Sequence, residues 1–200
     1  MALDFEGGLR RGHWLGLIAQ ISAGSVVVSG IVSGIGVALF LRDDWPDALI
    51  GTYEWHGLDV LLVIDFALVF ISYFAVGAWI YRAHANLLLT DAPQTEYTPG
   101  WALGWFAVPI ANFFKPFQAM KALWLASHGQ PAQTDETAPG LLWFWWLAWI
   151  TSSVGGYRDE IGTFDIVICV STAFSAACLI AIIRQINAAQ PDMSIASTFE

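Results

Sequence analysis

Charged residues are scarce in this chain. Aspartate, glutamate, lysine and arginine together make up 12% of its 200 residues, whereas an ordinary soluble domain carries about 25%. Hydrophobic residues make up 56%, and there are 11 Trp and 13 Phe, which is more apolar surface than a soluble globule of this length can bury. The composition excludes a disordered chain and a soluble domain. It predicts an integral membrane protein.

Basic residues are fewer than acidic ones. Eight Lys and Arg stand against 17 Asp and Glu, so the formal net charge is −9. Binding to nucleic acid depends on clustered Lys and Arg that neutralise phosphates. We therefore expect no nucleic acid partner.

Cysteine and histidine are rare as well. The two cysteines, Cys169 and Cys178, lie in one apolar run, and their spacing places them on opposite faces of a helix, where they cannot form a disulfide with each other. The four histidines are scattered, without H-x-x-x-H, H-E-x-x-H or C-x-x-C spacing, which are the patterns of metal sites. Nucleophile and phosphate-loop motifs are absent too. We expect no metal, no cofactor and no enzymatic activity.

Four apolar runs predict four membrane-spanning helices. They lie at about residues 14–41, 58–81, 141–156 and 164–184. The first run is about 42 Å long as a helix, ample for a hydrocarbon core of about 30 Å. Because it is far longer than the apolar region of a secretory signal, we expect it to be retained.

The second and third runs depart from a simple span. Nothing breaks the second helix at Tyr81, so we expect it to continue to about Leu89. The third run is apolar only up to Gly155-Gly156 and reaches about 21 Å. Its tryptophans are typical of residues at a membrane interface.

A further apolar segment covers residues 100–124. Pro109 interrupts it, and Lys115-Pro116 comes later in the same segment. It is a fifth span, a re-entrant hairpin or an interfacial helix. The excess of basic residues on the cytoplasmic side distinguishes these alternatives. Four spans with a cytoplasmic N-terminus place six basic residues inside and two outside, whereas five spans place four on each side. The six are Arg10, Arg11, Arg82, Lys115, Lys121 and Arg184, and the two are Arg42 and Arg158.

The predicted fold class is therefore an all-α integral membrane bundle of four transmembrane helices, forming one domain over residues 1–200. Both termini are cytoplasmic, and the 100–124 segment is interfacial or re-entrant on the inner side. We expect residues 127–140 to form a flexible polar loop and residues 187–200 a polar tail.

An ionisable residue lies inside the second predicted span. Asp65 is about 10 Å from the outer end of that span, a depth at which ionisable groups are unfavourable and commonly functional. With Asp59 and Asp165 towards the outer mouth, it forms a candidate site for protons or cations. The alternative is a hydrogen-bonded acid that ties helices together through Ser, Thr or Trp donors.

A second candidate site combines basic and amide side chains on the inner side. Its residues are Arg82, Asn86, Asn112, Lys115, Gln118 and Lys121. Arg82 and Asn86 share one helix face, and Pro109 exposes backbone groups near Asn112. Such a set suits a phosphate or the head group of an anionic lipid. The alternative is anchoring by basic residues together with hydrogen bonds that satisfy a broken helix.

Small residues recur on one face of the first span. They are Ser25, Ser29, Gly30, Ser33 and Gly34. Such a face allows another helix backbone to approach closely. We expect it to pack against the protein's own helices, or against a second copy or a partner membrane protein.

Two stretches resemble a known family. They are Tyr81-Arg-Ala-His-Ala-Asn-Leu and the segment from Thr98-Pro-Gly-Trp to Lys-Ala-Leu-Trp124, and they are similar to the bacterial membrane family catalogued as domain of unknown function 4328. The Trp-rich third span and Arg184-Gln-Ile fit as well, so the resemblance covers about residues 14–190. It implies a small, helical, multi-pass protein of the bacterial cytoplasmic (inner) membrane. It implies no activity and no catalytic residue.

Two functions follow from these patterns. The first is a non-enzymatic accessory, scaffolding or lipid-binding helical bundle. The second is a small oligomeric transporter or channel that uses Asp65. A pore requires Asp65 to face water or a symmetry axis, whereas a scaffold requires a neighbouring helix to satisfy it.

Overall fold

The computed structural model describes residues 2–41, 57–88, 97–130, 139–153 and 162–196. Every regular element within these ranges is a helix. The predicted all-α class is therefore confirmed for the described part of the chain.

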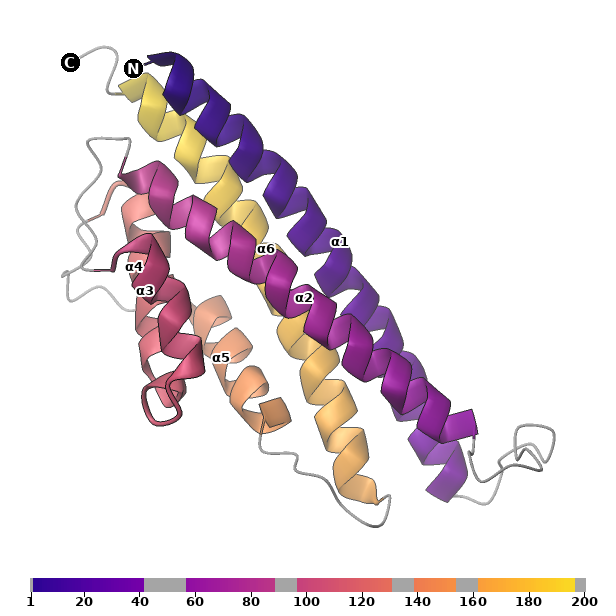
Figure 1. Ribbon diagram of the computed structural model, residues 1–200. Coiled ribbons are helices and arrows are strands. Elements are labelled where there is room, and N and C mark those ends of the chain that lie inside the picture. The colour runs from indigo at the N-terminus through magenta and orange to yellow at the C-terminus, as the bar shows by residue number, and fades with distance from the viewer. Residues whose placement is uncertain (1, 42–56, 89–96, 131–138, 154–161, 197–200) are drawn as a thin grey trace.

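Three long helices make up most of the bundle. They are α1 (Ala2–Leu41), α2 (Gly57–Leu87) and α6 (Thr163–Ala196), and α1 packs along both of the others. The start of α1 and the end of α6 lie at the same end of the bundle (Figure 1). Each helix contains a stretch long and apolar enough to cross a membrane, namely His13–Leu39, Val63–Leu87 and Thr163–Gln190.

The outward surface of these helices is apolar. Ile21 of α1 and Phe66 of α2 expose 73% and 72% of their surface. Phe66, Phe70 and Phe74 form a ladder of ring contacts along α2, with centroids 6.3 and 5.1 Å apart. A helix that is apolar on its outer face as well as its inner face is typical of a membrane span.

The segment around Pro109 forms a helical hairpin. Its elements are α3 (Pro99–Gly104), the short helices η2 (Trp105–Ala107) and η3 (Ala111–Phe113), and α4 (Lys115–Ser127). The chain reverses between η2 and η3, and α4 returns beside α3 (Figure 1). Because Pro109 cannot continue a helix, the reversal occurs where the sequence predicts a break. We call residues 97–127 the α3–α4 hairpin.

Local signals fix both ends of this hairpin. The Thr98 hydroxyl accepts a hydrogen bond from the Trp101 backbone N–H (3.4 Å) at the start of α3. At the end of α4, Gly129 adopts a positive φ of 73°, which glycine adopts without steric strain. The Gln130 N–H then reaches back to the Leu125 carbonyl (3.0 Å).

The short helix α5 (Gly140–Ser153) packs along α6 and against the hairpin. Aromatic rings join it to the hairpin: Phe117 lies 4.3 Å from Trp143, and Phe106 lies 6.1 Å from Trp149. Trp145, two residues beyond Trp143, is 3% exposed and belongs to the core. The main core therefore lies where α2, α4, α5 and α6 meet. Its largest fully buried side chains are Trp79, Met120, Leu123, Leu142, Ile182, Ile183 and Ile186.

Two predicted boundaries can be compared directly with the structure. The second helix ends at Leu87, close to the predicted Leu89. The predicted polar tail, residues 187–200, belongs to α6 as far as Ala196. The physical reason is that Asn187 and Gln190 point inward and make hydrogen bonds there. Of the predicted loop 127–140, residues 131–138 lie outside the described residues.

Candidate functional site

Buried amide side chains join α2, α4 and α6 at the end of the bundle where α2 finishes. Gln190 accepts a hydrogen bond from Asn86 Nδ2 (3.2 Å), and its own Nε2 donates to the Ala83 carbonyl (3.1 Å) and to Ser127 Oγ (3.4 Å). One turn earlier in α6, Asn187 Oδ1 accepts from Trp79 Nε1 (2.9 Å). We call this group the polar junction.

His84 lies beside the polar junction and is 1% exposed. Its Nδ1 lies 3.0 Å from the Ile80 carbonyl one turn earlier in α2, and the ring faces the backbone at Ala119 of α4. A carbonyl accepts hydrogen bonds only, so Nδ1 carries the proton in this contact. The YRAHANL stretch thus places His84 towards α4 and Asn86 towards α6.

The six residues of the predicted head-group site lie on α2 and on the hairpin, in different surroundings. Asn86 is 3% exposed and is part of the polar junction. Arg82 is half-buried and engages another group, and Asn112 lies at the turn of the hairpin. Lys121 is half-buried further along α4. Lys115 and Gln118 both contact Tyr97, Lys115 through its ammonium and Gln118 through a hydrogen bond, and Lys115 lines a pocket there.

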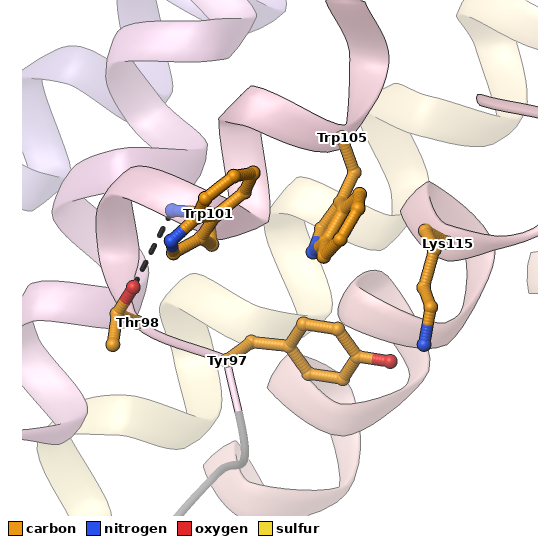
Figure 2. Close-up of a pocket in the computed structure, with 5 residues that line it drawn as sticks. All are labelled: Tyr97, Thr98, Trp101, Trp105 and Lys115. Carbon is orange, nitrogen blue, oxygen red and sulfur yellow. Dashed lines mark hydrogen bonds between the residues drawn. The ribbon is translucent and has the colours of Figure 1, made fainter. Parts of the chain in front are cut away.

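That site is a pocket on the α3–α4 hairpin with a volume of about 240 Å³. It is lined by Tyr97, Thr98, Trp101, Trp105 and Lys115 (Figure 2). The Lys115 ammonium lies 5.9 Å from the centroid of Tyr97 and 5.7 Å from that of Trp105, within the range of a cation–π contact. The Trp101 and Trp105 rings lie 4.8 Å apart at an angle of 34°. We call this site the aromatic–lysine pocket.

A hydrogen bond across the hairpin supports the pocket. Tyr97 Oη donates to Gln118 Oε1 of α4 (3.0 Å), one turn after Lys115. The pocket therefore combines one cation with three aromatic rings, and none of the described residues that line it is a carboxylate. This volume is below the range of about 300–1,000 Å³ of pockets for drug-sized ligands. The pocket suits a small anionic group rather than a whole organic cofactor.

Sequence reasoning found Lys115 and Gln118 but missed the three rings. Tyr97, Trp101 and Trp105 are spaced four residues apart, which is a pattern that puts side chains on one face of a helical segment. Within the described residues, no three His, Cys, Asp or Glu side chains are grouped so as to hold a metal ion.

The predicted intramembrane acids are engaged with neighbouring groups. The Ser29 hydroxyl of α1 donates a hydrogen bond to Asp65 Oδ1 of α2. Asp165 Oδ2 accepts from the Gly162 N–H (2.7 Å) at the start of α6. Both carboxylates lie near Cys169 of α6. The side chain of Asp59 lies outside the described residues.

The small-residue face of α1 packs within the chain. A Cβ atom on Gly30 would lie 3.1 Å from the Cys169 carbonyl oxygen and 3.2 Å from Ala173 Cβ, so α6 approaches α1 closely there. Gly34 packs beside Cys169 as well, and Ser29 meets Asp65 of α2. Ser29, Gly30 and Gly34 of this face therefore contact α2 and α6.

The family described as Domain of unknown function (DUF4328) matches residues 58–188. The chain belongs to this family. The DUF4328 region contains the aromatic–lysine pocket, α5 and most of the polar junction, and it begins with α2, so α1 lies outside it. The matched region therefore begins later in the chain than the resemblance predicted from the sequence, which covered about residues 14–190. No curated protein and no solved structure matches the chain.

Proposed function

We propose that this protein is a non-enzymatic scaffolding bundle that binds the phosphate of a membrane lipid in the aromatic–lysine pocket. The observation that carries the proposal is the position of the Lys115 ammonium over the rings of Tyr97 and Trp105. Tyr and Trp gather at membrane interfaces, and a lysine stem lies along apolar surface while its ammonium reaches the polar zone. Basic pockets beside spanning helices are the expected sites for phosphate head groups.

The depth of the hairpin supports this assignment. A Cβ atom on Gly77 would lie 3.1 Å from Leu103 Cδ1, so α3 packs against α2 at that level. Gly77 precedes Tyr81, the predicted inner end of the second span, by four residues, or about 6 Å along the helix, so α3 contacts α2 just inside a core of about 30 Å. We therefore propose that the hairpin is re-entrant and turns within the membrane, while its ends stay at the polar surface.

The proposed topology has four crossings and both termini in the cytoplasm. In this topology the short helix α5 is the fourth crossing, beside the three long helices. The chain direction of α5 is opposite to that of α6, so α5 runs away from the end of the bundle where α6 ends (Figure 1). The excess of basic residues at that end supports a cytoplasmic orientation. We propose a bacterial inner membrane as the location, because the sequence resembles a bacterial membrane family.

The surroundings of Asp65 favour the scaffold over the transporter. A carboxylate that accepts a hydrogen bond from Ser29 connects α1 to α2, as interhelical polar contacts in membranes do. In this proposal Asp65 contributes to helix association rather than to ion transport.

Lipid retention tests the proposal. The protein is purified into nanodiscs of ethanolamine and glycerol phospholipids, and native mass spectrometry counts the lipids that remain bound. We expect Lys115→Ala to weaken retention about fivefold, since a basic residue near a lipid surface contributes about 1 kcal/mol. Lys121→Ala is the matched control, because Lys121 lies on the same helix but does not line the pocket. Equal retention by the two variants would contradict the proposal.

A further inference from the structure

We infer that Arg184 of α6 and Gln20 of α1 form a second anion site, which takes the phosphate of an anionic phospholipid. The site lies on the outer surface where α1 and α6 pack together. It is separate from the aromatic–lysine pocket, whose lining residues belong to the hairpin, and it does not depend on the function proposed for that pocket.

One hydrogen bond orients the Arg184 side chain. Its Nε donates to Gln20 Oε1 (3.0 Å) across the contact between α6 and α1. Because a guanidinium group only donates hydrogen bonds, Gln20 turns its carbonyl oxygen towards Arg184 and keeps its amide N–H₂ as a further donor. The bond uses one of the five N–H groups of the guanidinium. Arg184 is exposed, so its other N–H groups can meet a ligand from outside the bundle.

The next residue adds donors of the same kind. Gln185 is exposed as well, and its Oε1 accepts a hydrogen bond from Trp124 Nε1 of α4 (3.2 Å). An indole N–H only donates, so the Gln185 amide turns its oxygen towards α4 and presents its N–H₂ group to a ligand. The surface around Arg184 thus combines one positive charge with two amide donors. This is chemistry that recognises an anion such as phosphate.

The position of the site along the helices indicates a lipid as the source of the phosphate. Gln20 lies six residues beyond Trp14, where the first apolar run begins, or about 9 Å along the helix. Ile18 and Ile21 beside it expose 52% and 73% of their surface, as on a face that meets lipid. A charged group next to such a face is unfavourable unless it is paired. The long arginine stem lets the guanidinium reach the phosphates of the head groups.

Charge selects among phospholipids. A glycerol phospholipid has a net negative charge, whereas the ammonium of an ethanolamine phospholipid cancels the charge of its phosphate. The Coulomb attraction to Arg184 therefore favours the glycerol lipid. We expect about fivefold enrichment of this lipid, which corresponds to one basic residue at an anionic lipid surface.

A competition between two lipids tests the inference. The Lys115→Ala protein is used, so that the aromatic–lysine pocket does not contribute. It is placed in nanodiscs with equal amounts of a glycerol and an ethanolamine phospholipid of identical acyl chains, and native mass spectrometry measures the bound ratio. We expect the glycerol lipid to be enriched about fivefold, and Arg184→Gln in the same protein to lower the ratio to about equality. Circular dichroism checks that each variant is folded.

Gln20→Glu separates a binding role from a structural one. A glutamate at this position would pair with Arg184 and strengthen the link between α1 and α6, but it would repel a phosphate. We therefore expect the enrichment to be lost although Arg184 is still present. His13→Glu is the matched control, because His13 is exposed and lies seven residues before Gln20. It adds the same charge about 10 Å away along α1, and the enrichment should persist.

The outcomes separate this inference from the proposed function. Absence of enrichment in the Lys115→Ala protein, or enrichment that survives both Arg184→Gln and Gln20→Glu, would overturn the inference and leave the proposed function intact. Lipid retention that depends on Arg184 and not on Lys115 would overturn the proposed function alone. Excess inorganic phosphate distinguishes the sources: displacement of the lipid would overturn the assignment to a lipid, and no displacement supports it.

Discussion

Replacement of Gln190 by alanine removes the side chain at the centre of the polar junction. In the native protein, Gln190 is 6% exposed and bonds to Asn86, to the Ala83 carbonyl and to the Ser127 hydroxyl. These contacts join α6 to α2 and α4. Alanine retains the helix but makes none of the three bonds.

The magnitude follows from the groups left behind. Asn86 Oδ1 makes no hydrogen bond within the described residues, so the loss of Gln190 would leave the buried Nδ2 of the same amide without its acceptor too. An unsatisfied buried polar group costs about 1–3 kcal/mol, while side-chain hydrogen bonds inside membrane proteins contribute about 0.6 kcal/mol on average. We therefore expect Gln190→Ala to lower the free energy of unfolding by about 2 kcal/mol.

Unfolding by a denaturing detergent, followed by circular dichroism, measures this change. Gln185→Ala is the matched control, because Gln185 lies on the same helix, is exposed, and accepts one hydrogen bond from Trp124 Nε1 (3.2 Å). Water can replace that partner, so the control should change the free energy of unfolding by less than about 0.5 kcal/mol. If the two variants were equally stable, the polar junction would not hold the helices together.

Two further changes probe the contacts of α1. Gly30→Ala should lower the free energy of unfolding by about 1–2 kcal/mol, because its methyl group would lie 3.1 Å from the Cys169 carbonyl oxygen and 3.2 Å from Ala173 Cβ, and this crowding outweighs the gain in helix propensity. Gly24→Ala should raise it by about 0.5–1 kcal/mol through helix propensity, since a Cβ there meets nothing within 4 Å; the same detergent titration compares both. Asp65→Asn keeps an acceptor oxygen for the Ser29 hydroxyl, and should leave assembly and growth under pH and sodium stress unchanged. A growth defect would support the transporter instead.

The long helices could be predicted from the sequence because a membrane imposes a simple condition. A span must be apolar over about 20 residues, and α1, α2 and α6 satisfy that condition in their own composition. Pro109 likewise marks the reversal of the α3–α4 hairpin, since its ring prevents continuation of the helix. The packing of α3 against α2 at Gly77 depends on tertiary contacts, which composition does not reveal.

The polar junction could not be predicted, because each of its side chains is satisfied by a residue distant in the sequence. Asn187 and Gln190 follow the last apolar run and have the composition of a tail. Their partners Trp79 and Asn86 lie on α2, more than a hundred positions away. Only the tertiary arrangement shows that these amides are buried.

The aromatic–lysine pocket was predicted in part. Lys115 and Gln118 were found because a phosphate site was sought among basic and amide side chains. Tyr97, Trp101 and Trp105 were not singled out from the sequence, because aromatic residues occur throughout this chain. Their spacing of four residues becomes informative only once α4 is known to return beside α3.

The lengths of the hairpin helices have a consequence for biogenesis. The α3 helix has 6 residues and α4 has 13, and neither is long enough to be inserted as an independent span. Backbone groups that are not paired within a helix need hydrogen-bond partners inside a membrane. The aromatic contacts between α5 and the hairpin can form only after α5 has been synthesised. In the re-entrant arrangement proposed above, we therefore expect the hairpin to enter the bilayer late, once the helices that flank it in sequence are in place, and a nascent chain that ends before α5 to hold it at the membrane surface.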